Sequence, residues 1–184
     1  MFRNFLIVST MLCIVSCKSP EARRPIKTSS GSFISESVER NKKLIEEEEG
    51  IIEALMEQDS TKKYIASESG FWYYYNVQDT LSTNKLPEFG DNVIFTYNIK
   101  HLNGDTILSE TDTGIQNYKV DQTNQALISG IRDGIKLMKE GETITFLFPS
   151  HKAYGYYGIE NKLGTNIPVQ STVTLKSINS TVNN

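Results

Sequence analysis

Apolar residues recur at every second position over most of the chain beyond residue 69, and this period limits the folds that are open to it. The strand-like segments are residues 71–77, 93–100, 143–148 and 172–178. One short segment, residues 127–138, has helical spacing instead and stops before Gly141. Because successive side chains of a strand point to opposite faces, the alternating segments predict a half-buried antiparallel sheet. One short helix against such a sheet defines an α+β fold.

An acidic helical segment is expected before the sheet, over residues 33–68. Ser35 is predicted to cap a helix that begins with Glu36, and Gly50 is predicted to bend or break it. The helix carries an apolar stripe of Leu44, Ile45, Ile51, Ile52, Leu55 and Met56. The stripe needs a partner, either the body of the protein or a second copy in a homodimer, and docking on the body is preferred. The four carboxylates at 46–49 are interpreted as a solvated face.

The amino terminus has the pattern of a bacterial lipoprotein signal. Arg3 precedes an apolar run over residues 5–15 that is of export-signal length and too short to span a bilayer comfortably. Residues 14–17, Ile-Val-Ser-Cys, resemble a lipobox, which predicts a signal peptide at 1–16 and lipidation of Cys17. An ordinary secretory signal with a chance cysteine is the alternative. Residues 17–32 are expected to form a flexible tether, which predicts a lipid-anchored protein of the cell envelope that faces the periplasm. By analogy with lipoprotein sorting, Lys18 favours the outer membrane.

Composition and cysteine placement exclude several functional classes. Both cysteines lie within the first 17 residues, so the body has no thiol for a disulfide, a zinc ribbon or a cysteine nucleophile. His101 and His151 lack partners at ligand spacing, so we expect neither a metal site nor a cofactor. The net charge is −3, and no basic face for nucleic acid is expected.

Four ordered motifs resemble the FKBP-type peptidyl-prolyl isomerases and span residues 87–179. They are Gly-Asp-Asn-Val at 90–93 running on to Tyr97 and Asn103-Gly104, Ile-Ser-Gly-Ile-Arg-Asp-Gly at 128–134, Ala-Tyr-Gly at 153–155 and Ile-Pro at 167–168. Each short motif is weak alone, but their order and spacing are specific. The lipobox, the acidic helix and residues 146–158 are also similar to lipid-anchored members associated with gliding motility in Bacteroidetes.

The resemblance implies an FKBP-type isomerase domain over residues 69–184. Its expected fold is a strongly curved antiparallel sheet wrapped around the short helix, with a pocket for the substrate proline between them. The expected activity is cis–trans isomerisation of X-Pro bonds, and the expected partners are X-Pro-containing polypeptide clients. In the envelope these clients would be exported proteins, motility components among them.

The same resemblance assigns site residues. It implies that Tyr97 forms a pocket wall, that Ile128 donates its backbone N–H to a substrate carbonyl and that Tyr154 donates its hydroxyl to another. The implied substrate-binding residues are Ile107, Leu108, Tyr118, Leu127, Ile131, Ile167 and Leu175.

Several of these positions depart from the family pattern. Ile107 and Leu108 stand where members usually have Phe-Asp, Ile131 replaces the tryptophan of the pocket floor, and Leu175 replaces a phenylalanine. The pocket therefore keeps its apolar character but loses aromatic walls. This loss motivates an alternative function, a weakly catalytic or non-catalytic chaperone or scaffold that binds unfolded chains through the same groove. Tyr156 and Tyr157, in a lengthened loop, are candidates to contact client chains.

Overall fold

The computed structural model describes residues 30–80, 85–122 and 126–180. The elements are α2 (Ser30–Gln58), β1 (Ile65–Ser67), β2 (Phe71–Val77), β3 (Asn92–Tyr97), β4 (Ile99–His101), β5 (Thr106–Leu108), α3 (Glu110–Thr113), β6 (Gln116–Lys119), α4 (Ser129–Ile135), β7 (Thr143–Phe148), the 3-10 turn η1 (Ser150–Lys152) and β8 (Val169–Asn179). The predicted signal peptide and the predicted lipidation site, Cys17, lie outside the described residues. No helix within the described ranges is both long and apolar enough to cross a membrane.

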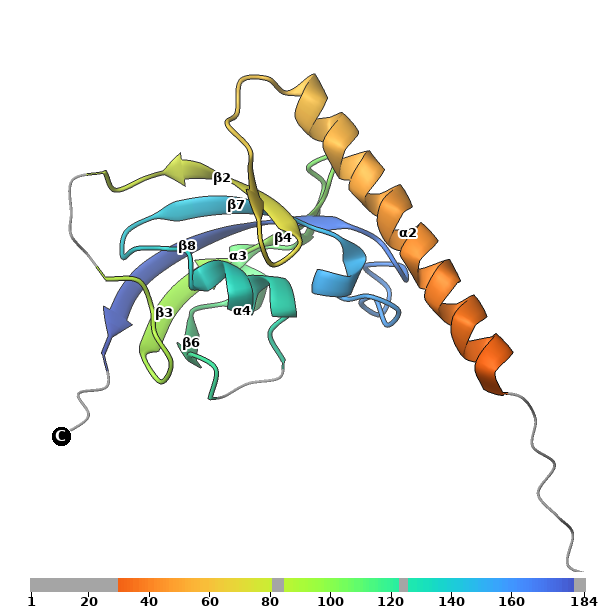
Figure 1. Cartoon of the computed structure of the whole chain (residues 1–184). Coiled ribbons are helices and arrows are strands. Elements are labelled where there is room, and N and C mark those ends of the chain that lie inside the picture. The colour runs from red at the N-terminus through yellow and green to blue at the C-terminus, as the bar shows by residue number, and fades with distance from the viewer. Residues whose placement is uncertain (1–29, 81–84, 123–125, 181–184) are drawn as a thin grey trace, which may run out of the picture. The chain divides into compact units, whose positions relative to one another are not determined.

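The strands form an antiparallel sheet with the order β1-β2-β7-β8-β3-β6, and β4 joins it by pairing with β8 and β5 (Figure 1). The eleven residues of β8 pair with β7, β3 and β4, so this strand links the two halves of the sheet. The predicted strand segments are present, except that 93–100 is divided at Asn98 into β3 and β4, and the α+β prediction is confirmed. The short strands β1 and β6 were not predicted, because three or four residues are too few to establish a period.

Strand β7 is buried on both faces. Phe146 and Phe148 point to the face that carries α4, where their rings stack 5.5 Å apart, centroid to centroid, and 6° from parallel. Leu147 points to the opposite face, where it borders the same hollow as Leu55 of α2. The sheet therefore has an apolar cover on each side of its centre.

Helix α4 lies on one face of the sheet (Figure 1), and its Gly130 and Gly134 lie directly against the rings of Phe148 and Phe146 of β7. At Gly130 an added Cβ would stand 2.5 Å from Cδ1 of Phe148 and 2.9 Å from the carbonyl oxygen of Lys152. Only a residue without a Cβ allows the start of the helix to approach the strand this closely. The position of α4 thus depends on Gly130.

The predicted bounds of the first helix were wrong at both ends. Helix α2 begins at Ser30, six residues before the predicted start at Glu36 and within the predicted tether. Serine is only slightly unfavourable inside a helix, so Ser35 does not have to act as a cap. The helix ends at Gln58, because the side chain of Asp59 accepts hydrogen bonds from the backbone N–H and hydroxyl of Thr61. Residues 65–67, assigned to the helical segment, form β1 instead.

Helix α2 is not interrupted at Gly50, contrary to the prediction. Gly50 is exposed, and its propensity cost of about 1 kcal/mol is small beside the packing of its neighbours. Of the stripe, Ile52 is fully buried and Leu44, Ile45, Leu55 and Met56 are partly buried, whereas Ile51 is 55% exposed. The chain from Val38 onward forms one compact unit, so docking of this part of the stripe on the body is confirmed. The prediction was wrong to include Ile51 in the apolar stripe that docks on the body.

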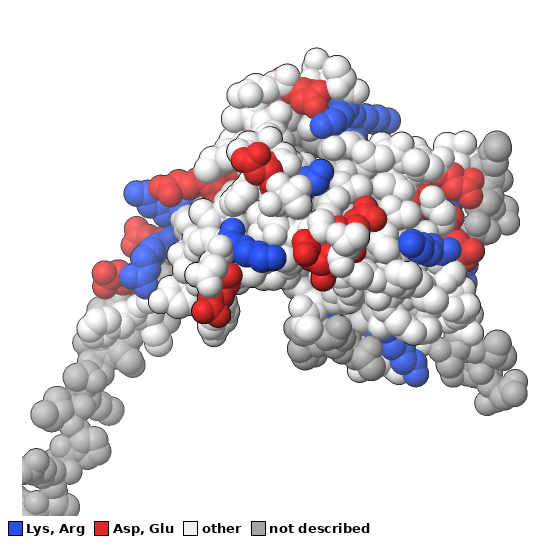
Figure 2. Space-filling model, turned by 180° about the vertical axis from the view of Figure 1, so that it is seen from behind, with Lys and Arg blue, Asp and Glu red and all other residues white. Residues whose placement is uncertain are grey.

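Acidic and basic side chains are interspersed on the face shown in Figure 2. On the described part of α2, Glu46 and Glu47 form exposed i,i+4 ion pairs with Lys42 and Lys43, each with 3.8 Å between nitrogen and oxygen. The prediction of a solvated acidic face holds for these two residues. It was wrong for Glu48, which is 3% exposed.

Two glycine-to-alanine substitutions should change the free energy of unfolding in opposite directions. We expect Gly130→Ala to lower it by about 1–3 kcal/mol, because the new methyl group overlaps Phe148. We expect Gly50→Ala to raise it by about 1 kcal/mol, because no atom lies within 4 Å of the new Cβ and alanine favours the helix. Urea unfolding of the two variants measures both effects. Equal stability of Gly130→Ala and the wild type would contradict the packing described for α4.

Candidate active site

The structure brings nine of the ten predicted site residues into one apolar cluster. The buried members are Ile107, Tyr118, Leu127, Ile128, Ile131 and Leu175, and the partly buried members are Tyr97, Leu108 and Tyr154. The tenth, Ile167, is 36% exposed and lies outside the cluster, in the loop before β8. Residues from four strands, from the start of α4 and from the loop after η1 therefore belong to the same hydrophobic core.

Three hydrogen-bond donors at the edge of this cluster are unused within the described chain. The backbone N–H of Ile128 makes no hydrogen bond there, while its carbonyl accepts from the N–H of Arg132 at 3.2 Å. Ile128 is the N-cap of α4, and its extended backbone turns that N–H out of the helix. The hydroxyls of Tyr97 and Tyr154 likewise have no partner among the described residues. The site thus offers donors beside an apolar surface.

Burial keeps the two tyrosine hydroxyls protonated. It raises the pKa of Tyr154 well above the ordinary value of 10, and the neighbouring Tyr97 raises it further. Burial also raises the pKa of Tyr97. Both groups therefore remain donors at neutral and moderately alkaline pH.

The turn after β7 carries Tyr154 and is tied to the start of α4. The hydroxyl of Ser129 donates to the carbonyl of Lys152 at 3.3 Å, and the ammonium of Lys152 lies 3.2 Å from the carboxylate of Asp133. Together with the close approach at Gly130, these contacts hold Tyr154 and Ile128 on neighbouring segments. The sequence placed the two residues in separate motifs and gave no sign of this connection.

Some predicted pocket residues lie beneath the surface. Ile131 and Leu175 are 0% exposed and Tyr118 is 1% exposed, so these residues support the site from below. The hydroxyl of Tyr118 accepts a hydrogen bond from the N–H of Asp121 at 3.0 Å.

Two fully buried phenylalanines that were not among the predicted site residues lie beneath the site. Phe95 lies next to Tyr97, with 6.0 Å between ring centroids. Phe148 lies directly under the first turn of α4. The available signal was the pair of phenylalanines at alternate positions of β7, which marks one aromatic face of that strand.

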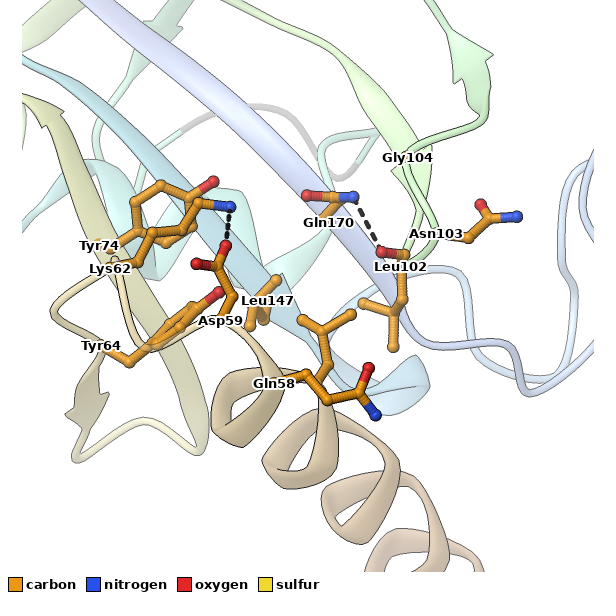
Figure 3. A pocket seen from close by; sticks show the side chains of 11 residues that line it. Gln58, Asp59, Lys62, Tyr64, Tyr74, Leu102, Asn103, Gly104, Leu147 and Gln170 are labelled. Carbon is orange, nitrogen blue, oxygen red and sulfur yellow. Dashed lines mark hydrogen bonds and ion pairs between the residues drawn. The ribbon is translucent and has the colours of Figure 1, made fainter.

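A second hollow of about 350 Å³ lies by the face of the sheet that carries Leu147, and it contains none of the predicted site residues (Figure 3). At one side of it the ammonium of Lys62 lies 2.9 Å from the carboxylate of Asp59 and 4.7 Å from the centre of the Tyr74 ring. At the other side Gln170 donates to the carbonyls of His101 and Leu102. No group of three or more potential metal ligands occurs in the described parts of the chain.

The site thus consists of unused donors beside an apolar cluster, in an α+β domain whose antiparallel sheet packs on one short helix. The profile of the FKBP-type peptidyl-prolyl cis-trans isomerases matches residues 83–176, just over half of the chain, and the chain belongs to this family. No curated protein matches its sequence significantly.

Solved structures share the fold. A peptidyl-prolyl cis-trans isomerase from Pseudomonas syringae has a TM-score of 0.56 and 18% identity, over 76% of this chain and 96% of that chain. FkpA from Escherichia coli has a TM-score of 0.57 and 20% identity, over 96% of this chain and 82% of that chain. At these identities the likeness concerns the fold.

The raised pKa of Tyr154 predicts a loss of stability at high pH. An unfolded tyrosine ionises near pH 10, whereas folded Tyr154 keeps its proton to higher pH. The free energy of unfolding should therefore fall above pH 10, by up to about 1.4 kcal/mol per pH unit for each retained proton. The free energy of unfolding of Tyr154→Phe, measured with urea, should fall less steeply between pH 9.5 and 11.5 than that of the wild type. Equal slopes would contradict the burial of this hydroxyl.

Proposed function

We propose that this protein is an active peptidyl-prolyl cis–trans isomerase. The observation that carries the proposal is the set of unused donors, the N–H of Ile128 and the hydroxyl of Tyr154, at the edge of an apolar cluster within a domain of this family. A proline ring would rest on the apolar side chains, and the donors would bind carbonyl groups of the same peptide.

The reaction needs no covalent chemistry. Rotation about an X-Pro bond faces a barrier of about 20 kcal/mol, because the planar amide has partial double-bond character. The twisted amide loses this resonance and is less dipolar, so an apolar site stabilises it relative to the planar ground state. Donors on either side of the bond fix the flanking carbonyls while the bond rotates.

We further propose that the protein is anchored in the bacterial envelope through lipid on Cys17. The support is the signal pattern at residues 1–16 and the lipobox at 14–17. Two acyl chains give stable anchoring, and the segment after Cys17 would let the domain reach clients in the periplasm, with the outer membrane as the preferred location. Its clients would be exported proteins, including components of gliding motility.

A second candidate is a chaperone or scaffold with little catalysis. Its support is the exposure of Tyr156 and Tyr157, 76% and 92%, which form an edge-to-face pair just after Tyr154. Exposed aromatic rings beside an apolar site suit the binding of unfolded chains. Homodimer formation through the N-terminal helix remains a prediction.

The isomerase proposal predicts that the purified protein accelerates a proline-limited refolding reaction, followed by fluorescence. Tyr97→Ala and Tyr154→Phe should each lower kcat/KM by about tenfold or more, because one removes a wall and the other a hydrogen-bond donor. Tyr64→Phe is the matched control, since Tyr64 borders the hollow away from the site and this variant should equal the wild type.

Two outcomes would contradict this reading. A folded wild-type protein that accelerates no X-Pro reaction would remove the catalytic proposal. If the same protein still suppressed aggregation of an unfolded client, and Tyr154→Phe kept that ability, the chaperone function would replace it.

The anchoring proposal predicts that wild-type protein sediments with membranes. Cys17→Ala should move it to the soluble periplasmic fraction or leave an uncleaved precursor, because the acceptor of the lipid is gone. Cys13→Ala is the control, since Cys13 lies within the predicted signal, and immunoblots of cell fractions give the measurement. Membrane association that is unchanged in Cys17→Ala would refute lipid anchoring at this residue.

A further inference from the structure

We propose that Glu48, on helix α2, is a positioning residue of the isomerase site, and that it acts through Ser150 on the turn that carries Tyr154. This inference rests on the proposed isomerase function and extends it. Glu48 lies outside residues 83–176, which the family profile matches, so the proposal assigns the preceding helix a part in the site.

Glu48 is a buried carboxylate whose two oxygens are both used. Its Oε2 accepts the backbone N–H of Ser150 at 2.6 Å, and its Oε1 accepts the Ser150 hydroxyl at 2.6 Å. Both residues are 3% exposed, so water does not compete for these bonds. Hydrogen bonds to a buried charged acceptor are stronger than those between neutral groups.

Ser150 has no other means of satisfying its N–H. It is the first residue of η1, and the residue before it, Pro149, provides no side-chain cap. The first N–H groups of a helical turn have no acceptor within the turn itself. Glu48 therefore supplies, from a segment 102 positions away, the acceptor that this turn lacks.

The same residue, Ser150, holds both neighbours of Tyr154. Its carbonyl accepts the N–H of Ala153 at 2.9 Å and the N–H of Gly155 at 2.8 Å. A shift of Ser150 would thus move the backbone on both sides of Tyr154. Glu48 binds the N–H and hydroxyl of Ser150, and the carbonyl of Ser150, in the following peptide group, accepts the N–H groups of the two residues that flank Tyr154.

The turn is held from two directions. On one side Lys152 is bound to Ser129 and Asp133 of α4, which aligns the turn with Ile128. On the other side Glu48 of α2 binds Ser150. Without Glu48 the contacts to α4 and the hydrogen bond from the Asn166 N–H to the Gly155 carbonyl remain, and two buried donors of Ser150 lose their acceptor. A displacement of about 1 Å in a catalytic group can lower a rate by about a hundredfold.

The test compares Glu48→Ala, Glu48→Gln and Ser150→Ala in the full-length chain, purified in detergent. Glu47→Gln is the matched control, because Glu47 is exposed and pairs only with Lys43 among the described residues. For each variant we would measure kcat/KM for X-Pro isomerisation, the free energy of unfolding and the amide hydrogen exchange of Ala153 and Gly155.

We expect Glu48→Ala to lower kcat/KM by about tenfold or more and to speed exchange at both amides by a similar factor. The kcat/KM and the exchange rates of Glu48→Gln should lie between those of the wild type and Glu48→Ala, because its amide keeps one acceptor oxygen. The values for Ser150→Ala should also lie between those of the wild type and Glu48→Ala. The double variant should differ little from Glu48→Ala, since both substitutions remove the same contact. Glu47→Gln should equal the wild type in every measurement.

A folded Glu48→Ala protein with normal kcat/KM and normal exchange at Ala153 and Gly155 would overturn the proposal, even if its unfolding free energy were lower. If Glu48→Ala does not fold, Glu48→Gln and Ser150→Ala decide by the same two measurements. If the wild type has no isomerase activity, the proposed function fails separately. In that case unchanged amide exchange at Ala153 and Gly155 in Glu48→Ala overturns the positioning role. Faster exchange at these amides supports the claim that Glu48 fixes the turn that carries Tyr154.

Discussion

Strand β7 is apolar on both faces at its end, and much of the structure depends on covering it. Phe146 and Phe148 need a cover on one face, and Leu147 needs one on the other. Helix α4 provides the first cover, and it can approach the rings only because Gly130 has no side chain. On the opposite face, near the start of β7, Thr143 and Thr145 form hydrogen-bonded pairs with Thr174 and Thr172 of β8.

This arrangement also builds the candidate site. Because the chain leaves β7 at Phe148 and turns at once through η1, the turn emerges beside the first residues of α4. Tyr154 and Ile128 therefore meet at one end of the core, although the sequence separates them. The turn remains within reach of α2 on its other side, where Glu48 binds Ser150.

The site could be predicted from the sequence only in part. The family resemblance assigned Tyr97, Ile128 and Tyr154 to one pocket, and all three belong to the same apolar cluster. The depth of each residue was not predictable in this way. Ile131 and Leu175 are fully buried beside Phe95 and Phe148, because burial depends on how side chains of different strands fill a shared volume.

Local patterns in the sequence determined the strand segments, the short helix, the α+β class and the family, since period, turn residues and motif order are properties of neighbouring residues. The tertiary structure alone decided that α2 runs on through Gly50, that β1 joins the sheet and that Glu48 is buried. A run of four glutamates looks solvated in sequence, because nothing nearby distinguishes one from the next. Only the fold brings Ser150 to Glu48, and a contact between residues 102 positions apart leaves no local signal.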